Sequence, residues 1–201
     1  MVQADFQDAD GLYPVTPQRD WKTVIGESIR TSGQLLEYCG IDTPNTELDP
    51  GPPFPLRVTR YYASLIEKGN PDDPLLLQVL PDRQERLHVK GYSSDAVGDH
   101  HAMPVPGLIH KYRGRVLLTL TGACAIHCRY CFRRHFPYVE AGADLTAGGP
   151  VMQYLAAHDD VSEVILSGGD PLMFGNRKLA ELVGRLNRVP HVRVLRIHSR
   201  L

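Results

Sequence analysis

Three cysteines carry the most specific chemical signal in this chain. Cys124, Cys128 and Cys131 lie in the run GACAIHCRYCFRRHF with the spacing CxxxCxxC. Cysteine thiolates bind iron–sulfur clusters, and a cubane cluster held by four of them is typical of an electron carrier. Three thiolates bind three irons and leave the fourth iron open to a small molecule. The spacing therefore predicts a four-iron cluster that works together with a bound cofactor.

Zinc is the first alternative for these cysteines. A structural zinc ion takes four ligands, so the fourth would be His127, His135 or Cys39. A disulfide framework is the second alternative, but it needs an even number of scattered cysteines, whereas three of the four cysteines here are clustered. Cys39 ends an expected helix and is interpreted as a buried apolar residue. The cluster is the favoured interpretation, with zinc kept as the alternative.

A second motif, SGGDPL, follows an expected strand. It supplies Ser167, Gly168, Gly169 and Asp170. Paired glycines let the backbone approach a ligand closely, and the carboxylate can accept a hydrogen bond from a ligand amino group. The same residues also form a good turn. Their place one strand–helix unit after the cysteines favours ligand contact.

Basic residues flank the cysteines. Arg133 and Arg134 follow the last cysteine, and arginine is well suited to clamp a carboxylate. The alternatives are a surface salt bridge or charge balance for an anionic cluster. Lys111 and Arg115 lie in HKYRGR, which is either a phosphate site or a solvated basic segment. The residues alone favour the solvated segment.

A parallel sheet is expected to position these side chains. The apolar, β-branched pattern predicts strands and helices in alternation, namely strands 115–120, 163–166 and 191–197 and helices 150–158 and 177–187. Such repeats form a parallel sheet with helices outside. Both motifs follow strands, where the functional loops of βα barrels lie. The fold class is therefore α/β, as part of a (βα) barrel.

The preceding region is expected to be mainly helical. We expect disorder in residues 1–17, a helix over 20–30 capped by Asp20, and an irregular stretch over 83–112. Short helices are expected within 34–38, 60–67 and 70–81, with a loop over 42–58. The chain thus divides into a helical and irregular region, 1–109, and the first units of an incomplete core, 110–201.

Composition and charge narrow the class of protein. The 201 residues are 42 % hydrophobic with a formal net charge of −1, as in an ordinary globular protein without a field that attracts nucleic acid. No apolar run is long enough to span a membrane, and the amino terminus is unlike a signal peptide. Clustered free thiols indicate the cytoplasm. Because the chain stops after a core strand, we expect a fragment of a longer protein.

Three segments of the chain together resemble a known enzyme family. CAIHCRYCFRRHF, SGGDPL and RIHSR resemble the lysine 2,3-aminomutase group of radical S-adenosylmethionine enzymes. The similarity is stronger to the branch of that group that supplies (R)-β-lysine for elongation factor P. Its segments cover much of residues 67–201, including 67–81, 105–118 and 128–138, while residues 1–55 match only in outline.

The resemblance implies roles for individual residues. Cys124, Cys128 and Cys131 would ligate a 4Fe-4S cluster. The segment Ser167, Gly168, Gly169 and Asp170 would contact S-adenosylmethionine. Arg133 would pair with the carboxylate of the substrate L-lysine. Lys111 and Arg115 would hold the phosphate of pyridoxal phosphate, with Lys111 standing where relatives carry arginine.

The resemblance also implies a reaction and partners. The enzyme would be an isomerase that moves the lysine amino group from carbon 2 to carbon 3, given an electron donor. A ligase would attach the product to elongation factor P. The Schiff-base lysine and the acidic residues that bind the substrate's far amino group would lie past Leu201, so no catalytic residue is expected in the fragment, which alone would be inactive.

Two other functions stay open from the residues. The first is an aminomutase that makes free β-lysine for metabolism. The second is a non-catalytic iron–sulfur module that contacts RNA through RYCFRRH and HKYRGR. The net charge and the few aromatic residues among the basic ones argue against nucleic acid.

Overall fold

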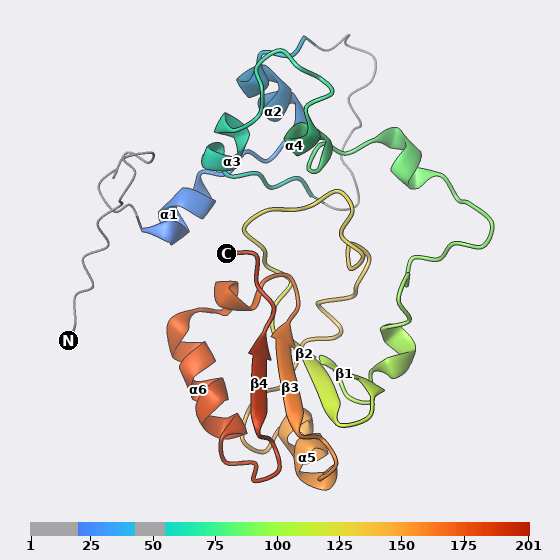
Figure 1. Ribbon diagram of the computed structural model, residues 1–201, viewed down its shortest axis with the longest axis vertical. Coiled ribbons are helices and arrows are strands. Elements are labelled where there is room, and N and C mark those ends of the chain that lie inside the picture. The colour runs from blue at the N-terminus through green and yellow to red at the C-terminus, as the bar shows by residue number, and fades with distance from the viewer. Residues whose placement is uncertain (1–19, 43–54) are drawn as a thin grey trace.

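A four-stranded sheet forms the centre of the carboxyl-terminal part of the protein (Figure 1). The computed structural model describes residues 20–42 and 55–201. The strands are β1 (Leu108–Tyr112), β2 (Arg115–Thr119), β3 (Glu163–Ser167) and β4 (Val194–Ile197), and they lie in that order. Strands β2, β3 and β4 are parallel. The predicted α/β class with parallel strands is thereby confirmed, whereas the assignment of these strands to part of a (βα) barrel stays a prediction.

Strand β1 corrects the sequence analysis, which treated residues 83–112 as irregular throughout. β1 pairs antiparallel with β2, and Tyr112 lies opposite Arg115 in the register. Gly114 closes the turn between the two strands with a φ of 79°, a conformation that glycine adopts without strain. The sheet is therefore mixed.

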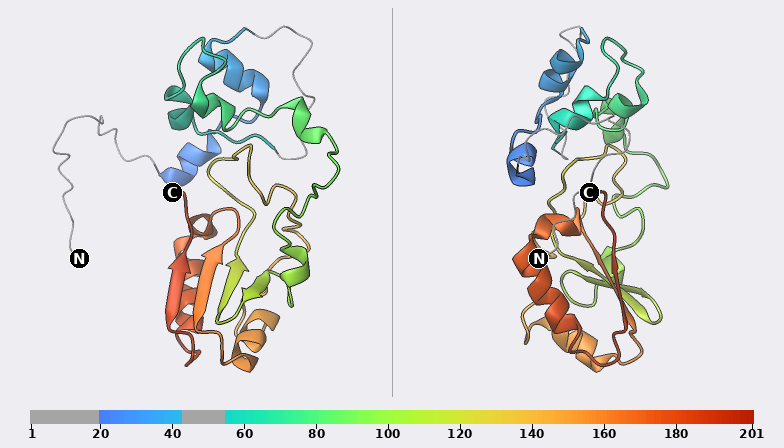
Figure 2. Two further views of the ribbon diagram at one scale, coloured as in Figure 1. Left: turned by 45° about the vertical axis from the view of Figure 1, so that its right-hand side comes forward. Right: turned by 60° about the vertical axis from the view of Figure 1, so that its left-hand side comes forward.

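One face of the sheet is covered by two helices, α5 (Pro150–Ala157) and α6 (Asn176–Leu186). Side chains alternate between the faces of a strand, so Val116 and Val164 pack with Leu155 and Leu182 in one core cluster. The neighbours Leu117 and Ile165 face the other way and line a cavity. Figure 2 shows both helices on the same side of the sheet.

Short helices form the amino-terminal part, at the top of Figure 1. They are α1 (Trp21–Gly26), α2 (Ser32–Cys39), α3 (Arg60–Ser64) and α4 (Pro74–Leu77), followed by the 3₁₀ turns η1 (Arg83–Arg86) and η2 (His100–Ala102). Helices α2, α3 and α4 share a second core cluster, which contains Cys39. The expectation for α1 was wrong in two respects. The helix ends at Gly26, and the Asp20 side chain makes no capping hydrogen bond.

The other helix predictions hold within a few residues. Gly40 ends α2 in the left-handed conformation, with φ 67°. Asp73 caps α4 by accepting hydrogen bonds from the N–H groups of Leu75 and Leu76. The expectations for residues 1–17 and for most of the loop 42–58 lie outside the described residues.

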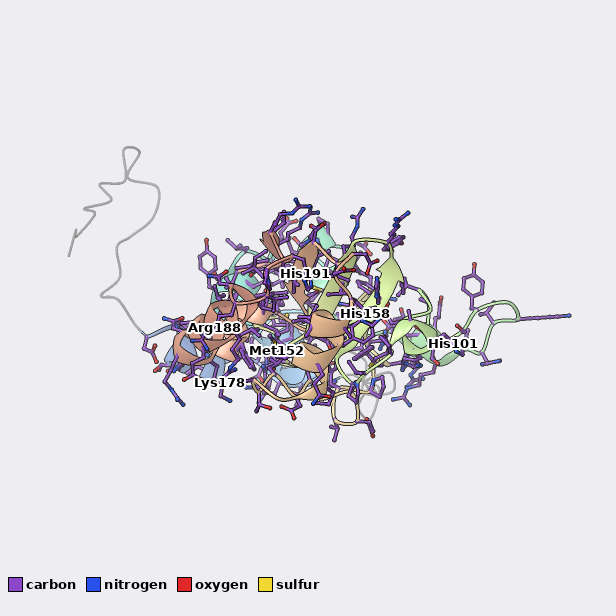
Figure 3. The ribbon with its side chains drawn as sticks, turned by 90° about the horizontal axis from the view of Figure 1, so that it is seen from below. His101, Met152, His158, Lys178, Arg188 and His191 are labelled. Carbon is purple, nitrogen blue, oxygen red and sulfur yellow. The ribbon has the colours of Figure 1, made fainter. Side chains whose placement is uncertain are left out.

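The amino ends of the parallel strands lie away from the cysteine loop. Figure 3 shows this end of the molecule from below. It labels Met152 in α5, His158 directly after α5, and His191, which precedes β4. Met152 belongs to the core beneath the sheet, and the His158 ring stacks on Tyr154.

Within residues 20–42 and 55–201, no helix is long and apolar enough to cross a membrane.

Candidate functional site

All three clustered cysteines line one cavity at the carboxyl ends of the parallel strands. The cavity has a volume of about 320 Å³. Segments from three strand ends meet there. The cysteine loop follows β2, Ser167 and two glycines end β3, and His198 and Arg200 follow β4. The predicted convergence of the two motifs at this edge is confirmed.

The cysteine loop bridges the sheet and the helical region. Its backbone N–H groups at His127 and Arg129 donate to the carbonyls of Arg57 and Gln78, at 2.9 and 2.7 Å. Arg57 in turn donates from Nη1 to the carbonyl of Cys124 at 2.9 Å. These contacts fix an otherwise irregular loop, because each ties it to a segment far away in the sequence.

The paired glycines let two loops approach each other closely. The N–H of Gly169 donates to the carbonyl of Thr121 at 2.7 Å. A Cβ on Gly168 would lie 2.5 Å from that carbonyl oxygen, and one on Gly169 would lie 2.3 Å from the carbonyl oxygen of Ala123. Any side chain at either position would push the cysteine loop away. The glycines are thus required for the shape of the cavity.

Burial disfavours the charged thiolate form of two of the three cysteines. Burial raises the pKa of Cys124, and it raises the pKa of Cys128 despite the nearby Arg200 guanidinium, which contacts the Cys128 sulfur. Burial also raises the pKa of Tyr138, another residue of the cavity wall, to about 12. A bound iron would displace the thiol protons, because metal ligation deprotonates a thiol.

Zinc fits this arrangement poorly. In the part of the chain that the structure describes, no three His, Cys, Asp or Glu side chains are grouped closely enough to hold a single metal ion. Of the fourth ligands considered, Cys39 lies in the separate helical core and His135 is exposed. His127 lines the cavity, but its Nδ1 is hydrogen-bonded to the carbonyl of Pro55. Thiolates bound to three different irons lie farther apart than ligands of one ion, so a cubane suits these cysteines better.

A second cavity, of about 280 Å³, adjoins the first on the open face of the sheet. Lys111 and Arg115 line it, as do Asp99 and the sheet residue Ile165. Four residues line both cavities, namely Leu117, Phe132, Arg133 and His198. The basic segment 110–115 and the cysteines therefore serve neighbouring spaces.

Arg133 is buried at the wall that the two cavities share. Its Nε donates to Asp99 Oδ2 at 2.9 Å, and its Nη1 donates to Ser167 Oγ at 3.1 Å. Lys111 binds the other oxygen of Asp99 at 2.5 Å. Burial alone would raise the pKa of Asp99, but Lys111 and Arg133 outweigh that effect and hold it below its ordinary value. No motif in the sequence points to Asp99 as a residue of the site.

Asp170 is buried next to the cavity but is not among its lining residues. Its carboxylate accepts hydrogen bonds from the N–H of Leu172, the hydroxyl of Ser199 and the N–H of Arg200. It thereby ties the loop after β3 to the segment after β4. Contact between Asp170 and a ligand stays a prediction.

The other arginines of the cysteine loop are neutralised by Glu85 in η1 and by Asp82, which precedes it. Arg129 pairs with Glu85 and also lies 3.5 Å from Asp82, and Arg134 pairs with the same glutamate at 2.5 Å. Together with the Arg133–Asp99 pair, these contacts leave RYCFRRH without the free cationic surface that phosphate-backbone binding requires.

Comparisons with known proteins agree with this picture of the site. A family model described as a 4Fe-4S single cluster domain matches residues 113–194, which include all three cysteines and SGGD. An L-lysine 2,3-aminomutase of Escherichia coli (strain K12) is 44 % identical over 190 residues, or 92 % of this chain and 55 % of that protein. The L-lysine 2,3-aminomutase of Haemophilus influenzae is 40 % identical over 93 % of this chain and 56 % of its own length.

A more distant relative matches nearly the whole chain. The L-lysine 2,3-aminomutase of Clostridium subterminale is 32 % identical over 98 % of this chain and 46 % of its own length. The chain therefore spans about half the length of the curated relatives that it matches.

Proposed function

We propose that this chain belongs to the lysine 2,3-aminomutase family, two members of which are 44 % and 40 % identical to it over about nine-tenths of its length. On that premise it forms the cofactor-binding part of an isomerase that converts L-lysine to (R)-β-lysine. The observation that carries the proposal is the pair of adjoining cavities, one lined by three thiols and the other by cations. A reaction that joins a metal cluster to an anionic, pyridoxal-bound substrate needs these two environments side by side.

The cavity of the thiols fits a 4Fe-4S cluster and S-adenosylmethionine. Cys124, Cys128 and Cys131 line this cavity and would hold the cluster through three thiolates, which would leave one iron available to the methionine part of the cofactor. Glycine backbone at residues 168 and 169 keeps the wall free of side chains. When bound, the pair supplies one-electron cleavage chemistry that can remove a hydrogen atom from carbon.

The second cavity fits the phosphate of pyridoxal phosphate. That cofactor would enable the substrate's amino group to migrate. Arg115 is exposed and can turn toward a phosphate, with its guanidinium near the Tyr112 ring. Lys111 is already bound by Asp99 and by the carbonyl of Val97, so we assign it the smaller share of phosphate binding. Of the five lysines in the sequence, it alone lines either cavity. We infer that none of the five forms the Schiff base.

Arg133 is proposed to bind the substrate carboxylate. Two of the five N–H groups of its guanidinium are used by Asp99 and Ser167, which leaves three for a ligand. A substrate carboxylate at this wall would place the lysine carbons between the two cavities. Leu117 and Phe132 line both spaces, so apolar side chains would face the reacting carbons.

We further propose that the product serves elongation factor P through a β-lysine ligase. The resemblance of residues 67–81 and 128–138 to that branch of the family supports this role over the supply of free β-lysine. The alternative of an RNA-binding module has less support, because the arginines of RYCFRRH are paired with Asp82, Glu85 and Asp99.

The proposal is tested by assaying the natural full-length protein under anaerobic conditions. Iron and sulfide are reconstituted, and L-lysine, pyridoxal phosphate, S-adenosylmethionine and a reductant are added. We expect (R)-β-lysine by chromatography and mass spectrometry, and none from Cys128→Ala. Cys39→Ala is the matched control, because Cys39 is buried in the helical core away from the cavity. A reconstituted wild-type protein that cleaves S-adenosylmethionine but leaves lysine unchanged would refute the proposed substrate.

A separate comparison in cells tests the elongation factor role. The intact mass of elongation factor P is compared between cells with and without the gene. We expect a β-lysyl addition only where the gene is present. Free β-lysine accumulating beside unmodified elongation factor P would favour the metabolic alternative.

A further inference from the structure

Asp99 is the one buried carboxylate of the second cavity, and it contacts two cations at once. We propose that Asp99 is a positioning residue that fixes the Arg133 guanidinium where it can bind the substrate carboxylate. The inference rests on the proposed function and adds to it the device that orients the carboxylate clamp.

The backbone around Asp99 is itself held in place. The Asp95 carboxylate accepts hydrogen bonds from the N–H groups of Asp99 and His100, at 2.8 and 3.0 Å. Gly98 precedes them with a φ of 68°, which lets the chain turn tightly. These contacts anchor Asp99 just before η2, so its carboxylate presents a fixed acceptor rather than a mobile surface charge.

Arg133 is then held from two directions. Asp99 comes from the segment before β1, and Ser167 is the last residue of β3. An arginine side chain has several rotatable bonds, and ordering it without such anchors costs conformational entropy. Two fixed acceptors order the Arg133 side chain before the substrate binds, so less conformational entropy is lost on binding.

The negative charge of Asp99 lowers the affinity of the cavity for a carboxylate, whereas its positioning of Arg133 raises that affinity. Removing it leaves the cavity more positive, because Lys111, Arg115 and Arg133 remain. If Asp99 only balanced charge, its loss would strengthen binding of an anionic ligand. If it positions Arg133, its loss weakens binding of a carboxylate even though the electrostatic attraction grows. The sign of the change therefore separates the two roles.

The test compares two ligands that differ only in the carboxylate. L-Lysine and 1,5-diaminopentane are titrated into the natural full-length protein, loaded with cluster, pyridoxal phosphate and S-adenosylmethionine but without reductant, so that no turnover occurs. For Asp99→Asn we expect the lysine dissociation constant to rise about 10- to 100-fold, as for loss of a hydrogen bond to a charged group. The constant for 1,5-diaminopentane should rise much less, because that ligand does not use the clamp and meets only the added positive charge of the cavity.

A second variant separates position from charge and guards against misfolding. Asp99→Glu keeps the charge but moves the carboxylate by one methylene, and we expect an intermediate loss of lysine affinity. Glu181→Gln, on the exposed face of α6, removes a carboxylate that pairs with Arg177 and Arg185, and it should leave both constants unchanged. Iron content and melting temperature are measured for every variant.

The outcomes are distinct. Unchanged or tighter lysine binding in Asp99→Asn, full affinity in Asp99→Glu, or equal losses for both ligands would each overturn the positioning role. A wild-type protein without any preference for lysine over 1,5-diaminopentane would instead refute the proposed function, and the inference would fall with it. A preference that is present in the wild type and survives Asp99→Asn would overturn the inference alone.

Discussion

At the scale of single residues, Asp170 could either contact a cofactor directly or anchor a neighbouring segment of the chain. The sequence suggested contact with a cofactor amino group, while the structure gives its carboxylate three donors from Leu172, Ser199 and Arg200. Arg200 lines the thiol cavity and contacts the Cys128 sulfur. Asp170 can therefore influence a cofactor through the segment that it anchors, without touching it.

Replacing Asp170 separates anchoring from direct contact. Asp170→Asn removes an acceptor for buried donors, so we expect a loss of stability of about 1–3 kcal/mol. Binding of S-adenosylmethionine should weaken as well, with iron content retained, and calorimetry measures both effects. Asp144→Asn, which alters a turn that ends at Thr146, is the control. Weaker cofactor binding at unchanged stability would indicate direct contact instead.

The residues that the sequence analysis missed are those whose partners lie far along the chain. The Arg133–Asp99 contact joins positions 34 residues apart, and no local pattern connects them. The signal near Asp99 was an acidic turn, SSDAVGD, which alone predicts only a loop. The cysteines, by contrast, could be assigned because all three ligands fall in one short run.

At the scale of elements, the loop after β3 supports the loop after β2. The parallel pairing of the two strands continues beyond their ends, through hydrogen bonds from Leu120 to Ser167, from Gly169 to Thr121 and from Asp170 to Ala123. The cysteine loop therefore leaves the sheet along a fixed path. This continuation depends on the absence of side chains at residues 168 and 169.

Adding a methyl group to Gly169 should disturb the cysteine loop. The new Cβ would lie 2.3 Å from a backbone oxygen, so we expect Gly169→Ala to lose about 1–3 kcal/mol of stability and to bind less iron. Gly184→Ala is the matched control. Gly184 lies in α6 with nothing within 4 Å, so its replacement should stabilise the protein by about 0.5–1 kcal/mol. Thermal unfolding and iron analysis check both, and full iron content in Gly169→Ala would contradict the role assigned to this glycine.

Elements with a strong apolar pattern could be predicted, and those with a mixed pattern could not. RVLLT and EVILS gave β2 and β3 because both are buried inside the sheet. LIHKY was missed because polar side chains interrupt it, and only its first two residues are buried. The same reasoning extended α1 too far, to residue 30 instead of Gly26, since no residue of that helix is buried and its pattern had no core to match.

At the scale of the whole molecule, the site is assembled from both parts of the chain. The amino-terminal region fixes the cysteine loop through Arg57 and Gln78, and the end of β3 fixes the start of that loop through Ser167 and Gly169. The sequence located the chemistry in the second part, whereas the contribution of residues 55–99 comes from tertiary contacts that no local rule predicts. Both cavities depend on that assembly.

Iron analysis with electron paramagnetic resonance tests the central claim most directly. After anaerobic reconstitution we expect roughly four irons per chain on Cys124, Cys128 and Cys131, and a spectrum of the reduced cluster that changes when S-adenosylmethionine is added. Alanine at any one of these cysteines should lower iron content sharply, while Cys39→Ala should retain it. Stoichiometric zinc with no iron–sulfur absorption, or equal iron loss in Cys39→Ala, would contradict the account.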